Sequence, residues 1–327
     1  MAELVSKASI AAAADTVRGI VTRTPLLRAP WAEHLVGGEV RLKCENLQRA
    51  GSFKIRGAYT LISRLPAEMR ERGVITYSSG NHGQGVALAA QLFGVKAVVV
   101  MPTTAPVVKI EGAKSYGADV ILEGTTSNDR KKRAEAEQAA HGYAMVPPFD
   151  HPDIIAGQGT IGVEILEDWP DVEAVLVPIG GGGMASGVAA WVKRTQPSCR
   201  VIGVEPAVSD AMRQSRQAGH PVSIEFRSSI ADGLLPVRPG DLTFQHVYDL
   251  ADDVVTVTED DILDATKMCL QKGKLIVEFS GAATLAALLS GKAKSPRAVA
   301  VLSGGNLDAA KVLGLMTDAA TPAVSAA

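Results

Sequence analysis

One lysine of this chain stands in a setting that could make its amine reactive. Lys54 follows Ser52 and Phe53 and precedes Ile55, so it lies among apolar and small residues just ahead of an expected helix. A lysine takes part in covalent chemistry only when its ammonium group is desolvated enough to lose a proton. Most lysines at the start of a helix are solvated surface residues, so this motif needs partners before it indicates a site.

A run of four glycines is the first such partner. The run at 180–183 follows the apolar residues 172–177 and precedes a helical stretch that starts at Met184. Consecutive glycines between a strand and a helix let several backbone N–H groups converge at the positive end of the helix, where they can hold a phosphate. The sequence therefore indicates an anion site at this turn.

A second glycine turn supplies a hydroxyl group. Ser303 follows the strand-like residues 299–302 and precedes Gly304 and Gly305. Pyridoxal 5'-phosphate requires a partner for its aldehyde, an anion site and a neighbour for its ring nitrogen. A reactive lysine, a phosphate site and a lone hydroxyl at strand ends meet these three requirements, so the motifs together favour a site for that cofactor.

The order of the motifs resembles the fold-type II pyridoxal-phosphate enzymes. The segment 52–58, the turn 78–85, the glycines 180–183 and the turn 303–306 follow one another as in that family, and the similarity covers nearly the whole chain. Within the family, the chain is most similar to the serine/threonine dehydratase and serine racemase branch. The resemblance implies a two-domain α/β fold of the tryptophan synthase β type, with parallel sheets flanked by helices and the cofactor in the interdomain cleft.

The same resemblance implies roles for individual residues. Lys54 is expected to form the internal aldimine and then to move the α-proton of the substrate. Asn81 is expected to contact the ring hydroxyl of the cofactor. The full set of expected cofactor-binding residues is Phe53, Lys54, Asn81, Gly180, Gly181, Gly182, Gly183, Met184, Glu278 and Ser303.

The substrate carboxylate has its own expected site. Ser78, Ser79, Asn81 and His82 occupy a strand-to-helix turn whose backbone N–H groups and hydroxyls suit an α-carboxylate. Within this turn, we expect His82 to be a helix-capping or packed histidine rather than a catalytic one.

Ser303 also indicates the type of reaction. A serine is a neutral partner for the pyridine nitrogen, whereas an aspartate would hold that nitrogen protonated, and a neutral ring is a weaker electron sink. Such a ring favours prompt loss of a β-substituent. We therefore expect β-elimination of a hydroxy amino acid, such as L-threonine or L-serine, to a 2-keto acid and ammonia.

Two alternatives within the family stay open. Serine racemases carry a serine at the position of Ser79, and a two-base racemase requires a hydroxyl on the face opposite the lysine, so Ser79 is a second candidate catalytic residue. The segments 148–150 and 231–244 instead resemble threonine dehydratases. Serine racemase and 3-hydroxyaspartate dehydratase are therefore alternative activities.

A cation site is a further expectation. Glu205 matches a glutamate that coordinates a divalent metal in the racemase-like members, and carboxylate oxygens suit a hard cation. This chain has Ala211 where those members carry an aspartate, although Asp210 stands next to it. A divalent or monovalent cation is therefore a candidate ligand of Glu205.

A different class of enzyme fits part of the pattern. Gly180, Gly182 and Ala185 follow a strand, and Glu205 stands about twenty residues further on, as in a dinucleotide-binding fingerprint. An NAD(P)-dependent oxidoreductase is thus the rival hypothesis. This hypothesis leaves the motifs of Lys54 and Ser303 unexplained. A non-catalytic binding protein is a third alternative, but it would not need a desolvated lysine.

The elements that must position these motifs alternate along the chain. Strand-like and helix-like runs follow one another almost throughout, which predicts parallel sheets covered by helices. Residues 73–149 hold three strands and three helices and are expected to form a small inserted domain; residues 1–72 and 150–327 are expected to form the large cofactor-binding domain. Ligands bind at the carboxyl ends of parallel strands, so the glycine turns should meet there.

Composition excludes several kinds of partner. The chain of 327 residues has 33 basic and 35 acidic side chains, so no nucleic acid is expected to bind. Its three dispersed cysteines indicate neither a zinc site nor disulfides. The N-terminus lacks the apolar core of a signal peptide, and no apolar run approaches the length of a membrane span. We expect a cytoplasmic homodimer that acts on a small amino-acid substrate.

Overall fold

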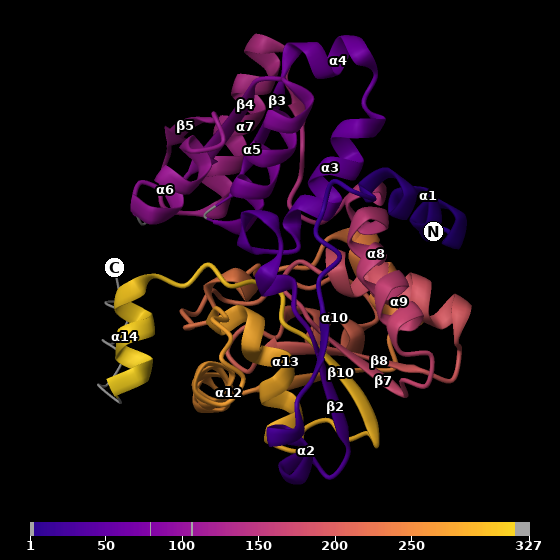
Figure 1. Ribbon diagram of the computed structural model, residues 1–327. Coiled ribbons are helices and arrows are strands. Elements are labelled where there is room, and N and C mark those ends of the chain that lie inside the picture. The colour runs from indigo at the N-terminus through magenta and orange to yellow at the C-terminus, as the bar shows by residue number, and fades with distance from the viewer. Residues whose placement is uncertain (1–2, 79, 106, 318–327) are drawn as a thin grey trace.

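Two separate sheets form the core of the protein in the computed structural model, which describes residues 3–78, 80–105 and 107–317 (Figure 1). The larger, six-stranded sheet has the order β1-β2-β10-β7-β8-β9. Its neighbouring strands are parallel except for β1 and β2, which are antiparallel. The strands are β1 (Leu26–Arg28), β2 (Glu39–Lys43), β7 (Ala174–Pro178), β8 (Arg200–Pro206), β9 (Asp253–Val257) and β10 (Arg297–Val301).

The smaller sheet has four strands in the order β5-β4-β3-β6, all of them parallel, and lies above the larger sheet in Figure 1. The sequence pattern predicts three strands between residues 73 and 149, and the structure adds the short β6. Two residues are too few to show an alternating pattern. The strands are β3 (Val74–Tyr77), β4 (Ala97–Met101), β5 (Asp119–Leu122) and β6 (Ala144–Met145).

Helices cover both faces of the larger sheet. Along β7, Ala174 and Leu176 pack into the core on one face, and Val175 and Val177 pack into the core on the other. Because both faces are buried, this strand is a continuous apolar run rather than an alternating one. The first face is covered by α2 (Pro30–Val36), α12 (Glu259–Gln271) and α13 (Phe279–Leu289), and the second by α8 (Pro152–Asp168), α9 (Gly183–Thr195), α10 (Ala211–Ala218) and α11 (Asp241–Leu250).

The smaller sheet is also covered on both faces. Val99 and Met101 of β4 pack with α5 (Asn81–Phe93) and α6 (Val107–Lys114), whereas Val98 and Val100 pack with α7 (Ser127–His141). The remaining elements are α1 (Lys7–Val17), α4 (Ala67–Arg72), α14 (Ala309–Thr317) and the 3-10 turns η1 (Glu45–Leu47), η2 (Arg49–Gly51) and η3 (Asp232–Leu234). Within the described ranges, no helix is long and apolar enough to cross a membrane.

Helix α3 (Lys54–Arg64) connects the layers of the two sheets. It packs against α5, which covers the smaller sheet, and against α8, which covers the larger one (Figure 1). Lys54 is its first residue, so the lysine lies where the two parts of the molecule meet. The carboxyl ends of β7 and β10 lead directly into the glycine turns at 180–183 and 303–305.

Candidate active site

Lys54 has the environment of a reactive amine. Its Nζ donates a hydrogen bond to the backbone oxygen of Pro148 at 2.8 Å and lies 5.1 Å from the centre of the Phe53 ring. Burial lowers the pKa of Lys54 to about 8, although the carboxylate of Glu278 acts in the opposite direction. An ammonium group surrounded by protein loses its proton more readily than one in water. The amine can therefore be neutral near physiological pH.

The tetraglycine turn leaves bare backbone at the start of α9. Gly182 has a φ of +97°, a backbone conformation that residues other than glycine rarely adopt. A Cβ atom on Gly181 would stand 2.2 Å from the ring of Phe149, so no larger residue fits there. The first N–H groups of a helix have no partner within the helix. The turn can thus offer them to an anion, and the phosphate site stays a prediction.

Two residues outside the predicted set support this turn. The Thr243 hydroxyl donates to the backbone oxygen of Gly181 at 2.6 Å. The carboxylate of Asp150 accepts hydrogen bonds from the backbone N–H groups of Asp241, Leu242 and Thr243, and so caps the start of α11. Both residues lie in segments that resemble threonine dehydratases. That resemblance was the one signal in the sequence that marked them.

Contacts of a single segment bring the lysine and the glycine turn together. Pro148 accepts the hydrogen bond from Lys54, and the next residue, Phe149, packs against Gly181 and Gly183. The amine and the turn therefore border the same short stretch of chain between β6 and α8.

The Ser303 turn contacts the two residues that precede the lysine. Its backbone oxygen accepts a hydrogen bond from the N–H of Phe53 at 3.2 Å, and Ser52 pairs with Gly304 in an isolated bridge. The Ser303 side chain is buried, with 4% of the residue exposed. The three motifs that are far apart in the sequence thus converge around Lys54.

Asn81 and Glu278 connect α5 to the segment before α13. The Asn81 amide donates to Glu278 Oε1 at 2.6 Å and accepts from the Asn306 amide at 2.9 Å. Burial and the nearby charge of Asp232 raise the pKa of Glu278 to about 7, even though Lys109 and Asn81 act in the opposite direction. Both predicted residues therefore lie next to the Gly304 turn.

The predicted carboxylate turn is described in part. The Ser78 hydroxyl accepts a hydrogen bond from the N–H of Gly80 at 3.1 Å. Ser79 lies outside the described residues. His82 is buried in α5, and its Nε2 lies 3.0 Å from the backbone oxygen of Val146. Since a carbonyl oxygen only accepts, this nitrogen carries the proton.

His82 is held neutral at this position. Burial and the charge of Lys54 lower the pKa of His82 to about 3, although the contact with Val146 acts in the opposite direction. Its Nδ1 is buried and has no hydrogen-bond partner among the described residues. The packing agrees with a structural histidine, and it leaves one free acceptor close to the lysine.

The residues fit pyridoxal 5'-phosphate in three respects. The glycine turn can accept a phosphate only because side chains are absent from it. Lys54 has a lowered pKa, which suits an amine that must attack an aldehyde. The buried hydroxyl of Ser52, two residues before Lys54, has no hydrogen-bond partner in the described part of the chain. This hydroxyl is therefore free to hydrogen-bond to a ligand.

Glu205, the predicted cation ligand, accepts hydrogen bonds from the protein backbone. Its two carboxylate oxygens accept hydrogen bonds from the N–H groups of Met212 and Arg213, both at 2.9 Å, at the start of α10. Burial raises the pKa of Glu205 to about 8, although these hydrogen bonds act in the opposite direction. Over residues 3–78, 80–105 and 107–317, no group of three acidic, histidine or cysteine side chains could hold a metal. Glu205 thus anchors the start of α10, and a cation at Glu205 stays a prediction.

Comparison with known proteins gives consistent results. A family model described as "Pyridoxal-phosphate dependent enzyme" matches residues 17–304. An L-threonine ammonia-lyase of Thermotoga maritima is 44% identical over 306 residues, which are 93% of this chain and 76% of that protein. The "L-threonine dehydratase catabolic TdcB" of Escherichia coli (strain K12) is 40% identical over 304 residues, 92% of each chain.

Solved structures agree with the sequence relatives. A maize serine racemase superposes with a TM-score of 0.93 and 38% identity, over 97% of this chain and 98% of that one. The processed form of threonine deaminase isoform 2 from Solanum lycopersicum superposes with a TM-score of 0.88 and 38% identity, over 95% of this chain and 86% of that one. These matches favour a pyridoxal-phosphate enzyme over the NAD(P)-dependent oxidoreductase of the rival hypothesis. The chain belongs to the pyridoxal-phosphate dependent enzymes of fold-type II, as its lysine and glycine motifs predict.

Proposed function

We propose that this protein is an ammonia-lyase that converts L-threonine or L-serine to a 2-keto acid and ammonia. The observation that carries the proposal is the position of Lys54, whose amine borders the segment that contacts the glycine turn and has a lowered pKa. The L-threonine ammonia-lyase and dehydratase relatives, at 44% and 40% identity, support the choice of substrate.

Each group of residues has a distinct task in this proposal. When bound, pyridoxal 5'-phosphate supplies an electron-withdrawing ring next to the α-carbon of the substrate. Gly180, Gly181, Gly182 and Gly183 hold the phosphate, and the turn from Ser78 to His82 binds the substrate carboxylate. Lys54 Nζ accepts the α-proton, which requires the neutral amine that burial favours.

Other residues orient the groups that react. Asn81 is fixed between Glu278 and Asn306, so its amide is held in one orientation, and it would contact the ring hydroxyl of the cofactor. Ser303 offers a neutral hydroxyl to the ring nitrogen. Phe53 and Met184 are further proposed contacts of the cofactor.

A substrate panel tests the proposal. The purified protein with its cofactor should release ammonia and a keto acid in equal amounts from L-threonine or L-serine, and Lys54→Ala should release neither. We also include 3-hydroxyaspartate, because its β-hydroxyl could leave in the same way. A cofactor-loaded parent protein that forms no keto acid from L-threonine or L-serine would contradict the proposal, and keto acid from 3-hydroxyaspartate alone would favour that alternative.

Racemisation is a second candidate, supported by the 0.93 TM-score to a maize serine racemase. Inversion of L-serine needs a proton donor on the face opposite Lys54, and Ser79 is the candidate from the sequence. We expect dehydration to be the larger activity, because the segments 148–150 and 231–244 resemble dehydratases. Chiral chromatography beside a keto-acid assay measures both products, and D-serine in large excess over pyruvate would reverse this ranking.

We also propose a cytoplasmic homodimer, divided into a large domain of residues 1–72 and 150–327 and a small domain of residues 73–149. Leu47 and Ile276 support the dimer: both are about half exposed, and their segments are joined by a hydrogen bond from Asn46 to the backbone oxygen of Ile276. The three buried, unpaired cysteines are compatible with a reducing compartment. Sedimentation equilibrium of the purified protein tests the dimer, and a monomeric mass would contradict it.

A further inference from the structure

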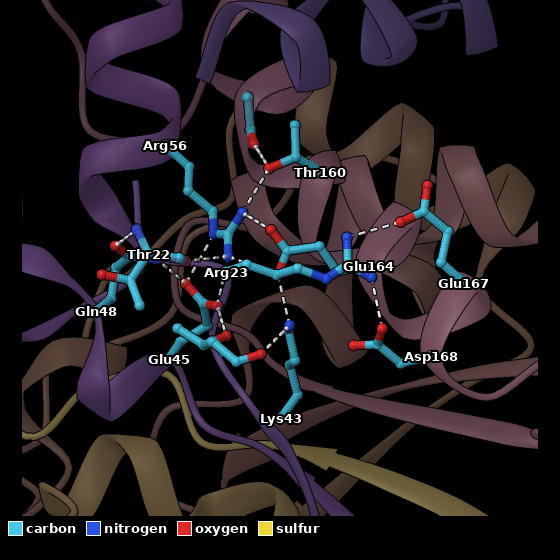
Figure 2. Close-up of polar contacts among 12 residues, drawn as sticks. Thr22, Arg23, Lys43, Glu45, Gln48, Arg56, Thr160, Glu164, Glu167 and Asp168 are labelled. Carbon is cyan, nitrogen blue, oxygen red and sulfur yellow. Dashed lines mark hydrogen bonds and ion pairs between the residues drawn. The ribbon is translucent and has the colours of Figure 1, made fainter. Parts of the chain in front are cut away.

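Figure 2 shows a network of ion pairs around Arg56, which stands in the first turn of α3. Arg56 and Lys43 supply two positive charges, and Glu45 and Glu164 supply two negative ones. The side chains of Arg56, Lys43 and Glu45 are fully buried, and the Glu164 side chain is 11% exposed. The network is therefore neutral as a whole and isolated from water.

The guanidinium group of Arg56 uses all of its donors in this network. Its Nε and Nη2 each donate to a different oxygen of Glu45 at 2.8 Å. Its Nη1 and Nη2 donate to the two oxygens of Glu164 at 2.7 and 2.9 Å, and Nη1 also donates to the Thr160 hydroxyl at 3.1 Å. Two bidentate contacts fix both the position and the plane of the guanidinium group.

The partners of Arg56 belong to elements that surround α3. Glu45 stands in η1, two residues after the end of β2, and Thr160 and Glu164 stand in α8. Lys43, at the end of β2, donates to Glu164 and to the backbone oxygen of Thr24. The network thus fastens α3 to the larger sheet and to α8 at the same time.

Stability alone is a weak explanation for such a network. Removing charges from water is costly, and replacing buried ion pairs by apolar side chains of similar volume is often neutral or stabilising. A guanidinium group with all its donors paired also fixes the geometry around it. The residue of α3 that this geometry could affect is Lys54.

The first turn of α3 carries Lys54 and has no side-chain cap. Phe53 precedes the helix and forms no side-chain hydrogen bond to cap it. Residues 54 and 56 are separated by about 200° around a helix, so Lys54 and Arg56 point to nearly opposite sides. Lys54 reaches Pro148 on one side, and Arg56 enters the network on the other.

Close helix contacts on both sides leave this turn little room to move. A Cβ atom on Gly85 of α5 would stand 3.0 Å from the Cβ of Lys54. A Cβ atom on Gly157 of α8 would stand 2.5 Å from the backbone oxygen of Arg56. The backbone of the turn is thus confined between two helices.

We propose that Arg56, held by Glu45 and Glu164, is a positioning residue that fixes the rotation of the first turn of α3 and so aims the amine of Lys54 into the site. The inference rests on the proposed role of Lys54. It separates two functions: the glycine turn retains the cofactor, and the network determines how well the lysine reaches it.

Arg56→Lys tests the inference because it keeps the buried positive charge and removes the fork. Three quantities are measured: the amount of pyridoxal 5'-phosphate retained after gel filtration, the rate of its covalent attachment to residue 54, trapped by borohydride and mapped by mass spectrometry, and the thermal midpoint. We expect retention within about twofold of the parent and attachment slowed about tenfold, which corresponds to roughly 1.4 kcal/mol.

Arg23→Met provides a matched control. Arg23 pairs with Glu167 and Asp168 at the exposed end of the same helix α8 (Figure 2), and its side chain is 53% exposed. Pairs of this kind contribute little, so attachment in this variant should match the parent. Should Arg56→Lys fail to fold, Glu164→Gln takes its place, because it keeps the shape of the network and removes one charged partner of Arg56.

Two results would overturn the inference, and they are distinguishable. If attachment proceeds at the parent rate in Arg56→Lys, with or without a lower thermal midpoint, the network has no positioning role. If the parent protein attaches no cofactor at residue 54, the proposed role of Lys54 fails and the inference fails with it. Slow attachment with normal retention, in Arg56→Lys but not in Arg23→Met, supports the positioning role.

Discussion

The pH dependence of cofactor attachment should report the buried environment of Lys54. Only the neutral amine attacks an aldehyde, and burial disfavours the ammonium form, so the pKa of Lys54 falls to about 8. At pH 7.5 such an amine is about one quarter neutral, whereas a lysine with its ordinary pKa near 10.5 is neutral in only about one molecule in a thousand. Burial therefore increases the reactive fraction roughly two-hundredfold.

The carboxylate of Glu278 should oppose this effect. A negative charge near the lysine favours the ammonium form and raises the pKa of Lys54. Glu278→Gln removes that charge and retains an oxygen that can accept the hydrogen bond from Asn81. We therefore expect the attachment rate of the Glu278→Gln apoprotein to reach its plateau at a lower pH than that of the parent.

The assay is stopped-flow absorbance of apoprotein mixed with pyridoxal 5'-phosphate between pH 6 and pH 11. Glu173→Gln is the matched control, because Glu173 pairs with Arg297 at the opposite end of β7 from the glycine turn. The control should show the parent midpoint, near pH 8. A parent midpoint near 10.5, or a midpoint that Glu278→Gln leaves unchanged, would refute the reasoning.

Three further substitutions test other parts of the site. Gly182→Val places a valine at a φ of +97°, with its Cβ 2.9 Å from Thr243 Cβ, and the backbone strain alone is about 1–2 kcal/mol. Equilibrium dialysis should show cofactor retention weakened at least tenfold, and parent-like retention would place the phosphate elsewhere. Thr243→Val removes the hydrogen bond to Gly181 and leaves a buried acceptor unpaired, at a cost of about 1–3 kcal/mol; cofactor retention should fall while the circular dichroism spectrum is kept, and unchanged retention would show that the turn needs no support from α11. Ser79→Ala should abolish D-serine formation and keep part of the keto-acid production, because inversion needs a second proton donor and elimination does not; persistent racemisation would exclude Ser79 as that donor.

The local motifs were predictable from the sequence because each depends on neighbouring residues. The glycine run at 180–183 and the lysine at the start of a helix lie in short segments, and the structure places both at the predicted ends of their strand and helix. Strands buried on both faces are visible as continuous apolar runs, as in β7. The family resemblance added the order of the motifs, which a single motif cannot provide.

Interactions between distant residues were not predictable in the same way. Arg56 and Glu164 stand 108 positions apart in the sequence, and no periodicity links them. The contacts of Glu205 were also not predictable from the sequence. A carboxylate after a strand can bind a cation or cap a helix, and only the structure shows that the Glu205 oxygens accept hydrogen bonds from backbone N–H groups.

The identity of the lysine that carries the cofactor is the central claim, and one measurement tests it most directly. The parent protein is saturated with pyridoxal 5'-phosphate, reduced with borohydride, digested and analysed by mass spectrometry. We predict that the phosphopyridoxyl group is found on the peptide containing Lys54, at close to one group per chain, and that Lys54→Ala carries none. Modification of a different lysine, or retention of the label in Lys54→Ala, would contradict the account.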